Sequence, residues 1–488
     1  MTTLPIKELL IDSESSLKDA MRVIDGNAQG VVFVVSKQFQ LVGVLTDGDI
    51  RRALLEGSEL TTQISKVMRT EFVSRSVTTD NKELISLLND KIRHIPLVDK
   101  ENRPVDYACI HHLRHIQVME PVLNGNELEY VSDCIKTNWI SSQGKYVRRF
   151  EEVFSSYCSM QYGLAVSNGT VALHLALEAL GVGPNDEVIV PDLTFAATIN
   201  AVLYTGATPI LADIEPVAWT LDPKQVEKLI TPRTKAIIPV HLYGQACKMD
   251  ELMELAKRHK LFVVEDCAEA IGTEYKGKHV GSFGDVSAFS FFGNKTITTG
   301  EGGMLLFKDK KLFERASILR DHGMSRQKKY WHDEVGYNYR MTNLQAAIGV
   351  AQMERVGDFV GHKRRLAELY CGFFSGTLKI TPPAKANWSN NSYWLYTILL
   401  DSSSGIARDE IIKKMLMNGI ETRPAFFPLH KMPPYERFAQ GSGFPVSCDI
   451  SSRALNLPSS VFLQKEDVER ICKTLLAMFE IRSMINKV

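Results

Sequence analysis

A lysine with unusual neighbours is the first candidate for chemistry in this chain. Lys295 lies between the apolar run 286–289 and the Gly- and Thr-rich stretch 296–303. A Walker A phosphate loop is excluded, because no glycine directly precedes the lysine and the upstream glycine spacing is wrong. A lysine that forms a Schiff base needs a neutral amine, and therefore a desolvated or cation-flanked position. Taken alone, Lys295 is better explained as a partly buried structural lysine, so further residues must decide.

An aspartate at a predicted strand end is the second candidate. Residues 261–265 form an apolar run that predicts a strand, and Asp266 follows it directly. In α/β sheets, ligands bind at the carboxyl ends of the strands. A buried aspartate there needs a cationic partner, and a protonated pyridine nitrogen is one such partner.

A phosphate-binding pattern is the third candidate. The run 163–166 leads into Ser-Asn-Gly-Thr at 167–170 and then into a clear helical pattern, 171–180. Helix N-terminal amides beside a hydroxyl bind phosphate. Ser290, five residues before Lys295, offers a further hydroxyl. Each hydroxyl taken separately is more simply explained as a helix cap.

An aromatic residue completes the set. Phe195 follows the predicted strand 187–190 and would offer its face to a planar ring, although a single phenylalanine is more often part of the core. A lysine, a strand-end aspartate, a phosphate loop and a stacking ring together are what pyridoxal phosphate requires. The sequence therefore predicts this cofactor. No metal site is predicted, because the eight cysteines contain no CxxC pair.

These residues require a sheet whose strand ends meet at one edge. Apolar runs alternate with helical patterns through most of 140–360, which predicts βαβ units and a mainly parallel sheet. The predicted strands are 187–190, 208–213, 235–240, 261–265, 286–289 and 303–307. We expect an α/β large domain that binds the cofactor at 117–360, and a small C-terminal α+β domain at 361–488.

The first 116 residues show a different pattern, built from short predicted strands and helices. Strand patterns at 29–35 and 41–45 are joined by a turn near 37–40, and Asp47 is expected to cap a helix at 49–56. The same pattern follows a second time, more weakly. It has a helix at 84–91 and strands at 94–98 and 105–110, with a turn between the strands. We expect an internal duplication with a unit of roughly 55–60 residues.

This region resembles a tandem cystathionine-β-synthase (CBS) domain pair. The match lies in Gly-Val-Leu-Thr-Asp-Gly-Asp-Ile-Arg-Arg at 43–52. The resemblance implies that Thr46, Asp47 and Asp49 hold the ribose and phosphates of an adenine or guanine nucleotide. The second copy has Asp-Tyr-Ala-Cys-Ile at 106–110 instead of the family pattern, so at most one nucleotide site is expected. A purely structural or dimerising module with empty sites is the alternative.

The rest of the chain, about 120–480, resembles the DegT-type nucleotide-sugar aminotransferases within the fold-type I aspartate aminotransferase superfamily. The resemblance is carried by SNGT at 167–170, PVHLYG at 239–244, VVEDCAEA at 263–270, the Lys295 loop and GYNYRMTNLQAAIG at 336–349. It implies a covalent link from Lys295 to the cofactor, and Asp266 on the ring nitrogen. The other implied cofactor contacts are Glu269 on the ring hydroxyl, Gly169, Thr170 and Ser290 on the phosphate, and Phe195 stacked on the ring.

The same resemblance implies an obligate homodimer with shared active sites. In the family the partner subunit reaches the phosphate through its equivalent of GYNYR, which here offers Asn338 or Arg340. The sequence does not decide between these two residues. An assembly larger than a dimer could form through the CBS pair.

Substrate choice is carried by weaker motifs: WISSQG at 139–144, RDHG at 320–323, YWH at 330–332 and ETRPAFFPLH at 421–430. These motifs look most like those of GDP-perosamine synthases, which aminate C4 of a GDP-linked 4-keto-6-deoxymannose. That resemblance implies glutamate as amino donor, a nucleotide-linked keto sugar as acceptor, and a role in surface polysaccharide or glycan biosynthesis. The residues it offers for substrate contacts are Ser141, Ser142, His322, Arg423 and His430. Each also has a structural explanation; Arg423, for example, could pair with a nearby carboxylate.

Composition excludes other classes of function. The chain has 488 residues, with 57 Lys+Arg balancing 57 Asp+Glu, so no broad surface for nucleic acid or anionic membrane is expected. No apolar run reaches the roughly 18 residues of a membrane span. The amino terminus lacks a signal-peptide pattern, so we expect a cytoplasmic protein.

Two alternative functions remain. A pyridoxamine-phosphate-dependent sugar dehydratase would share the fold, but it would have histidine in place of Lys295. A nucleotide-sensing regulator with a vestigial catalytic half is disfavoured by the intact Asp266 and Lys295.

Overall fold

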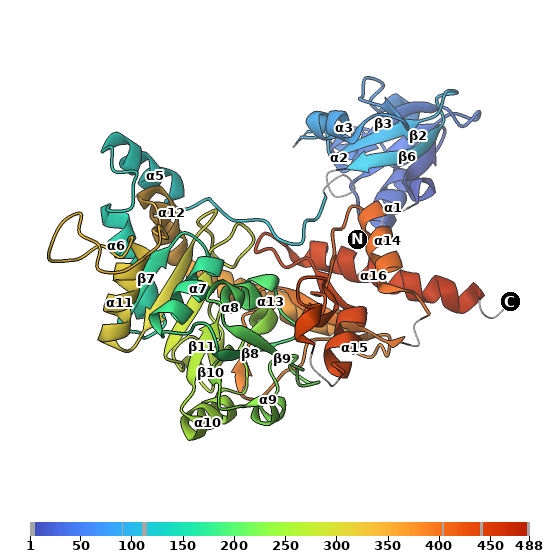
Figure 1. The fold of residues 1–488 in the computed structure, drawn as a ribbon. Coiled ribbons are helices and arrows are strands. Elements are labelled where there is room, and N and C mark those ends of the chain that lie inside the picture. The colour runs from blue at the N-terminus through green and yellow to red at the C-terminus, as the bar shows by residue number, and fades with distance from the viewer. Residues whose placement is uncertain (1–4, 90, 110–114, 403–404, 440–442, 486–488) are drawn as a thin grey trace. The chain divides into compact units, whose positions relative to one another are not determined.

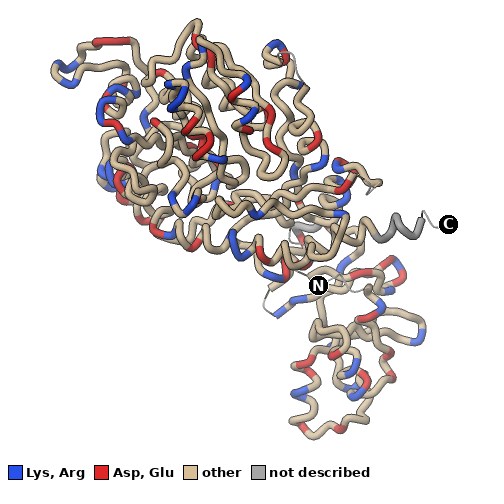
Figure 2. The backbone as a smooth tube through the Cα atoms, turned by 90° about the horizontal axis from the view of Figure 1, so that it is seen from below, with Lys and Arg blue, Asp and Glu red and all other residues tan. Residues whose placement is uncertain are grey.

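The chain folds as two compact units, Met1–Ile116 and Gln117–Val488. The structure is a computed structural model that describes residues 5–89, 91–109, 115–402, 405–439 and 443–485 (Figure 1). Acidic and basic residues are mixed along the backbone of each unit (Figure 2).

The amino-terminal unit contains two small sheets of the same topology. In each sheet the first strand is parallel to the second, and the second is antiparallel to the third. The elements are η1 (Ile6–Leu9), β1 (Leu10–Asp12), α1 (Leu17–Asn27), β2 (Val31–Val35), β3 (Leu41–Thr46), α2 (Asp47–Leu55), η2 (Ile64–Lys66), β4 (Arg75–Ser76), α3 (Asn81–Leu87), β5 (His94–Val98) and β6 (Pro104–Cys109). The predicted duplication is therefore present.

The turn between the last two strands shows the repeat most clearly. Phe39 in the first copy and Asn102 in the second both have a left-handed backbone, with φ of 64° and 59°. They are 63 residues apart, so the predicted unit of 55–60 residues was too short. Ile110, the last residue of the expected final strand, lies outside the described residues.

The cap of α2 also differs from the prediction. Thr46, rather than Asp47, is the N-cap, because its hydroxyl accepts from the Asp49 amide while the Asp49 carboxylate accepts from the Thr46 amide. This is a capping box, which satisfies two amides that the first helical turn leaves free.

The second unit is built on a mixed, mainly parallel sheet that has seven strands in the described part of the chain. Its order is β7-β15-β14-β11-β10-β8-β9, and only β15 runs against its neighbours. The strands are β7 (Tyr162–Val166), β8 (Glu187–Pro191), β9 (Thr208–Ala212), β10 (Thr234–Ile237), β11 (Phe262–Asp266), β14 (Val286–Ser290) and β15 (Gly303–Phe307). All six predicted strands are present, and the predicted fold class is confirmed.

Helices cover both faces of this sheet, because alternate side chains of each strand point to opposite faces. In β8, Ile189 joins one apolar core and its neighbours Val188 and Val190 join the other. In Figure 1, α7 and α8 lie side by side on one face. The helices are α5 (Glu127–Lys136), α6 (Lys145–Tyr157), α7 (Gly169–Ala179), α8 (Ala196–Tyr204), α9 (Pro223–Leu229), η3 (Leu242–Gly244), α10 (Met249–His259), α11 (Lys310–Arg320) and α12 (Asn343–Met353).

Two smaller sheets and the last helices complete this unit. A short sheet has the order β13-β12-β17, and an antiparallel sheet has the order β16-β18-β20-β19. The elements are β12 (Glu274–Tyr275), β13 (Lys278–His279), α13 (Val356–Phe374), β16 (Ile380–Thr381), β17 (Ser389–Asn390), β18 (Tyr396–Leu400), α14 (Arg408–Met417), β19 (Arg423–Pro424), η5 (Leu429–Lys431), η6 (Glu436–Phe438), α15 (Pro445–Arg453), β20 (Ala454–Leu457) and α16 (Lys465–Ile485). The predicted boundary at residue 360 falls inside α13, so the subdivision at that position stays a prediction.

The connection from β14 to β15 carries Lys295. The two strands are antiparallel, with Ser290 opposite Gly303, so the connection is a long hairpin loop rather than a crossover. Its base is closed by a hydrogen bond from the Phe291 amide to the Gly302 carbonyl (2.8 Å). The Lys295 amide donates to the Phe292 carbonyl (2.9 Å). The lysine is therefore presented by a loop that is fixed at its base.

Candidate active site

The strand ends of the large sheet bring the predicted cofactor residues to one edge. Asp266 is the last residue of β11, Ser290 is the last residue of β14, and Phe195 precedes α8 shortly after β8 ends. These strands are parallel, so their carboxyl ends share one edge of the sheet, where α/β proteins bind ligands.

The Lys295 amine lies in a nearly closed environment. Its side chain is only 12% exposed, and Nζ lies 3.7 Å from Glu269 Oε1. Nζ also lies 3.7 Å from the centroid of the Trp394 ring. Burial lowers the pKa of Lys295, and the nearby carboxylates of Glu269 and Asp266 oppose that shift only in part. A lowered pKa favours the neutral form of the amine, which is the form that a nucleophile requires.

Glu269 shares this environment with the lysine. Its Oε2 accepts a hydrogen bond from the Tyr243 amide (2.9 Å). Burial raises the pKa of Glu269 to about 7, although Lys295 and the Tyr243 amide act against the shift. Burial thus disfavours charge on both partners of the Glu269–Lys295 pair.

Asp266 is a buried carboxylate without a hydrogen-bonded cation in the described part of the chain. It is 4% exposed, and its oxygens accept from the Thr198 hydroxyl (2.8 Å) and the Ala268 amide (3.1 Å). Burial raises the pKa of Asp266 above its ordinary value. A protonated pyridine nitrogen would supply the missing cation, so this residue fits the predicted cofactor.

The predicted phosphate cradle lies at the start of α7, where the backbone packs closely. Asn168 caps the helix by accepting from the Val171 amide (3.0 Å). A Cβ on Gly169 would lie 2.8 Å from the Ser290 Cβ, and one on Gly303 would lie 2.5 Å from the Asn168 carbonyl oxygen. Glycine at these two positions lets the helix N-terminus approach β14 and β15. The first-turn amides and the Thr170 and Ser290 hydroxyls form a site suited to phosphate.

Phe195 is exposed, which argues against a core role. Its side chain is 59% exposed, and its ring lies 5.7 Å from that of Phe426. A large aromatic side chain exposed at the ligand edge of the sheet offers a face on which a planar ring can stack.

The residues predicted for substrate contacts fall into different settings. Arg423 forms an ion pair with Glu421 (2.8 Å), and His430 Nδ1 lies 2.8 Å from Asp192 Oδ2. Ser141 accepts through its carbonyl from the Asn343 amide (3.0 Å), and Ser142 is half-buried beside it. Arg423 and His430 thus have the carboxylate partners that a structural role requires.

His322, Asn338 and Arg340 form one polar cluster. Arg340 pairs with Asp321 (2.5 Å), and its Nη2 lies 3.2 Å from Asn338 Oδ1 and 3.3 Å from His322 Nε2. The backbone of this segment runs beside the start of the phosphate cradle, since the Ser167 amide donates to the Tyr339 carbonyl (2.9 Å). The structure therefore places His322 beside Asn338 and Arg340, the two candidates for the contact with the partner subunit's phosphate.

The sequence analysis missed Trp394, Tyr243 and Thr198. Trp394 covers the lysine, Tyr243 supplies the amide bonded to Glu269, and Thr198 donates to Asp266. Tyr243 lies within the PVHLYG motif and Thr198 lies three residues after Phe195, so their positions gave a usable signal. Trp394 is 99 residues from Lys295 in sequence, and no local pattern joins them.

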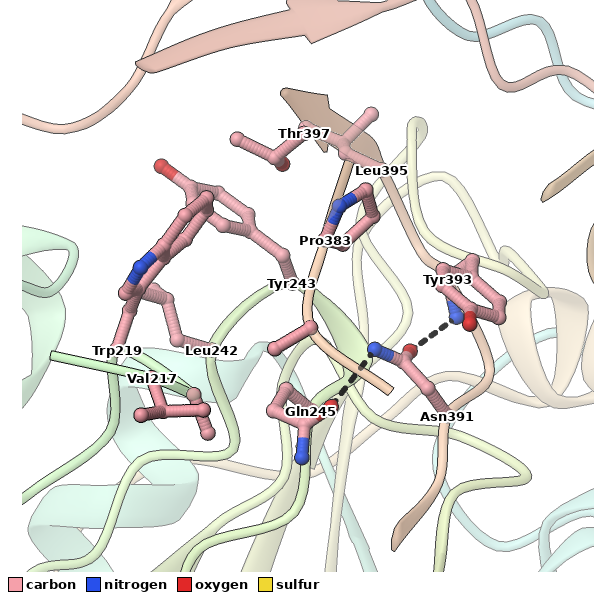
Figure 3. Close-up of a pocket in the computed structure, with 12 residues that line it drawn as sticks. Val217, Trp219, Leu242, Tyr243, Gln245, Pro383, Asn391, Tyr393, Leu395 and Thr397 are labelled. Carbon is pink, nitrogen blue, oxygen red and sulfur yellow. Dashed lines mark hydrogen bonds between the residues drawn. The ribbon is translucent and has the colours of Figure 1, made fainter. Parts of the chain in front are cut away.

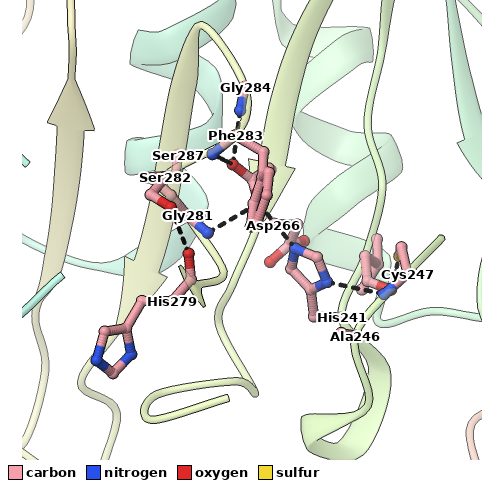
Figure 4. Close-up of polar contacts among 12 residues, drawn as sticks. His241, Ala246, Cys247, Asp266, His279, Gly281, Ser282, Phe283, Gly284 and Ser287 are labelled. Atoms are coloured by element: carbon pink, nitrogen blue, oxygen red, sulfur yellow. Dashed lines mark hydrogen bonds and ion pairs between the residues drawn. The ribbon is translucent and has the colours of Figure 1, made fainter. Parts of the chain in front are cut away.

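A buried His-Glu-Cys cluster lies at the end of β11, where Figure 4 labels His241 and Asp266. His241, Glu265 and Cys267 offer ligand atoms within 4.8 Å of one another. The Glu265 carboxylate already accepts from the amides of Gly281, Phe283 and Gly284, and His241 pairs with it at 3.1 Å. These contacts explain the cluster as a hydrogen-bonded support for β11, and the prediction of no metal site stays a prediction.

A small pocket borders the site on the side of Tyr243 (Figure 3). Trp219, Tyr243, Asn391 and Tyr393 are among its lining residues. Its volume is about 20 Å³, which is space for one water molecule. It is too small for a nucleotide sugar.

The predicted nucleotide residues of the amino-terminal unit are partly engaged. Asp49 is 7% exposed and accepts from the Thr46 hydroxyl (2.6 Å) and from Arg69 (2.8 Å), and it also pairs with Arg52. Burial would raise the pKa of Asp49, but these hydrogen bonds hold it below its ordinary value. Asp47 is exposed and pairs only with Arg51 in the described residues (2.8 Å).

The fold and the site together define an enzyme that binds pyridoxal phosphate. The model of the DegT/DnrJ/EryC1/StrS aminotransferase family matches residues 121–476, and the chain belongs to this family. The CBS domain model matches residues 2–56, which is the first copy of the repeat.

Individual relatives extend over most of the second unit. The chain is 47% identical over 363 residues to GDP-perosamine synthase of Escherichia coli O157:H7, covering 74% of this chain and 98% of the relative. It is 38% identical over 331 residues to UDP-N-acetyl-3-dehydro-alpha-D-glucosamine 3-aminotransferase of Acidithiobacillus ferrooxidans, covering 67% and 87%. The PLP form of Spr1654 from Streptococcus pneumoniae aligns with a TM-score of 0.71 at 28% identity, covering 75% of this chain and 99% of that one.

These findings confirm the predicted class of enzyme. The chain is an aminotransferase that depends on pyridoxal phosphate, and the two alternatives, a dehydratase and a vestigial regulator, are not favoured. Among the described residues, no helix has both the length and the apolar character needed to cross a membrane.

Proposed function

We propose that this aminotransferase moves the amino group of glutamate to C4 of a GDP-linked 4-keto-6-deoxymannose. The product would be a perosamine-type nucleotide sugar for surface polysaccharide or glycan biosynthesis. The observation that carries the proposal is the buried Lys295–Glu269 pair at the same sheet edge as Asp266. The 47% identity to a GDP-perosamine synthase supports the choice of sugar.

The proposed roles follow from the contacts. Bound pyridoxal phosphate supplies an electron sink for the carbanion that forms at the donor's Cα. Lys295 holds the cofactor and, once its amine is free, moves the proton at that Cα. Asp266 keeps the ring nitrogen protonated, and Glu269 contacts the ring hydroxyl.

The remaining cofactor contacts are assigned to the cradle and to the exposed ring. Gly169, Thr170 and Ser290 would bind the phosphate, since the start of α7 presents free amides there. Phe195 would stack on the pyridine ring.

Substrate contacts are proposed for several residues, most of which have partly exposed side chains. Arg423 is partly exposed, so it could exchange Glu421 for the diphosphate, as arginine binds phosphate oxygens strongly. Ser141 and Ser142 would face the nucleotide, and His322 would contact the substrate from its polar cluster. His430 is held by Asp192, and this contact supports a role in fixing the loop after β8.

We propose a homodimer in which Asn338 or Arg340 reaches the partner's phosphate site. The support is that both side chains lie in a surface cluster and that Phe195 is left exposed by its own chain. Sedimentation velocity of the full chain, with the N338A and R340A variants, tests this. A monomer with full cofactor binding would contradict the proposal.

The first CBS copy is proposed to bind an adenine or guanine nucleotide through Thr46, Asp47 and Asp49, and thereby to tune activity or assembly. Asp49 is saturated by its own chain, so the exposed Asp47 and the half-exposed Arg52 and Arg69 would make new contacts. Calorimetric titration of the full chain with AMP, ATP, GDP and GTP tests this. No heat with any of the four would remove the proposal.

A cytoplasmic location belongs to the same proposal. All eight cysteines are free thiols, as is usual in a reducing compartment. A charged nucleotide sugar would also have to be used on the side of the membrane where it is made.

The test of the main proposal is amination of a panel of keto sugar nucleotides, followed by mass spectrometry. GDP-4-keto-6-deoxymannose and a UDP-linked 3-keto sugar are the decisive pair. Glutamate-dependent amination of the GDP sugar is the expected result. Amination of the UDP sugar alone would reject the sugar assignment while retaining the class of enzyme.

A further inference from the structure

A second buried lysine lies in the enzyme unit, without a carboxylate partner. Lys363 is on α13 and is 1% exposed. Within the described residues no acidic oxygen lies within ion-pair distance of it. Burial lowers the pKa of Lys363 to about 7. Removing a lysine from water without pairing it is costly, so a specific role for its amine is expected.

The amine of Lys363 joins three separate segments. Nζ lies 2.8 Å from the Ser459 carbonyl oxygen, 3.1 Å from the Trp394 carbonyl oxygen and 3.3 Å from the Met119 sulfur. Two N–H groups suffice for the two carbonyls, so either protonation state of the amine can make these bonds. Of the three contacts, the one to Trp394 leads to the active site.

Trp394 is held at both ends. Its carbonyl accepts from Lys363, while its indole Nε1 donates to the carbonyl of Asn294, the residue before Lys295 (2.7 Å). The indole ring also stacks against Tyr243, with centroids 6.3 Å apart and an interplanar angle of 23°. These restraints fix the position of the ring that covers the Lys295 amine.

The indole face controls how much water reaches that amine. Lys295 Nζ lies 3.7 Å from the ring centroid, and the charged groups that act on it are Glu269 and Asp266. The ring keeps the neutral amine dry, and it attracts the amine by a cation–π contact whenever a proton arrives. Desolvation is the main cause of the lowered pKa of Lys295.

We propose that Lys363 is a positioning residue that clamps the Trp394 backbone and so keeps the indole over the Lys295 amine. This inference rests on the proposed catalytic role of Lys295. Lys363 itself contacts none of the cofactor-site residues that the structure describes. Its proposed function is to set the reactivity of the Lys295 amine.

The test measures the Lys295 amine directly in full-length protein freed of cofactor. The rate at which a small acylating reagent modifies Lys295 is followed against pH by peptide mass spectrometry. The midpoint of this profile reports the protonation of the amine independently of turnover. The variants are W394A, K363M, K363Q and the double variant W394A/K363M. W388A is the control, because Trp388 is a half-buried indole whose Nε1 donates to Ala246.

The expected midpoints form a series. W394A admits water to the amine and raises the midpoint by about one pH unit or more. K363M raises it by less, and the double variant matches W394A, because Lys363 acts through Trp394. K363Q retains an N–H donor one atom shorter and lies between K363M and wild type. W388A matches wild type.

Two outcomes would overturn the proposal. One is a K363M profile that superimposes on wild type while its melting temperature falls, since Lys363 would then be structural alone. The other is an unfolded K363M accompanied by a K363Q profile identical to wild type. Failure of the proposed function is recognised separately, because wild-type protein reconstituted with pyridoxal phosphate would then lack an absorbance band that depends on Lys295.

Discussion

Two buried aspartates, one in each unit, show how differently the same side chain can be used. Asp49 is satisfied by Arg52, Arg69 and the Thr46 hydroxyl, and its pKa is lowered. Asp266 has a hydroxyl and an amide as hydrogen-bond donors, and burial raises its pKa. The first carboxylate is completed by its own chain. The second lacks a hydrogen-bonded cation in the described part of the chain, and the proposed cofactor would supply one.

The variants D266N and D49N test most strongly whether the two aspartates differ in function. D266N removes the anion that holds the ring proton, and amination is expected to fall by about 10²-fold or more. Steady-state amination measured by mass spectrometry checks this. D49N is the matched control and should retain activity in the absence of nucleotide. Equal losses in both variants would contradict the distinction.

The cofactor side of the comparison is tested by G169A. The added Cβ would lie 2.8 Å from the Ser290 Cβ, which forces α7 away from β14. We expect pyridoxal phosphate to bind about tenfold more weakly or worse, which is a loss of about 1.4 kcal/mol or more. Fluorescence titration of cofactor-free protein measures this, and G357A is the control, because nothing lies within 4 Å of a Cβ there. Unchanged affinity in G169A would refute the cradle.

The structural side of the comparison is tested through pH. The folded-state pKa of Asp49 is depressed, so its stabilisation is present above the unfolded value of about 4 and is lost as the pH falls toward the folded value. D49N should destabilise the amino-terminal unit by about 1 kcal/mol near neutral pH, since both arginines are more than half exposed. Thermal melts from pH 7 to pH 3 check this. The gap between wild type and D49N should close at the acid end; a constant gap would contradict the assignment.

The smallest expected effect concerns Phe195. F195L keeps an apolar side chain but loses the flat ring, and a loss of about 0.5 kcal/mol in cofactor binding is expected. F195Y keeps the ring and should bind as wild type does. Titration of both variants with pyridoxal phosphate decides the matter, and a weak F195Y beside a normal F195L would exclude stacking.

Much of the fold and site followed from local patterns. The strand ends at Asp266 and Ser290 and the helix start at Gly169 were predictable, because each depends on a few consecutive residues. What the sequence left out depends on distant contacts: Trp394 over Lys295, Lys363 on the Trp394 carbonyl, and Arg69 on Asp49. Helix α13 runs across the predicted boundary at residue 360, so the subdivision at that position stays a prediction.

The hairpin loop between β14 and β15 has a consequence for the order of folding. Its closing contacts, such as Phe291 to Gly302, join residues near in sequence, and such contacts form early because little chain entropy is lost. The contact between Lys295 and Trp394 spans 99 residues, so closing it costs more chain entropy, and we expect it to form later. A chain in which the loop has formed but Trp394 has not yet reached it would carry a lysine amine that is open to water.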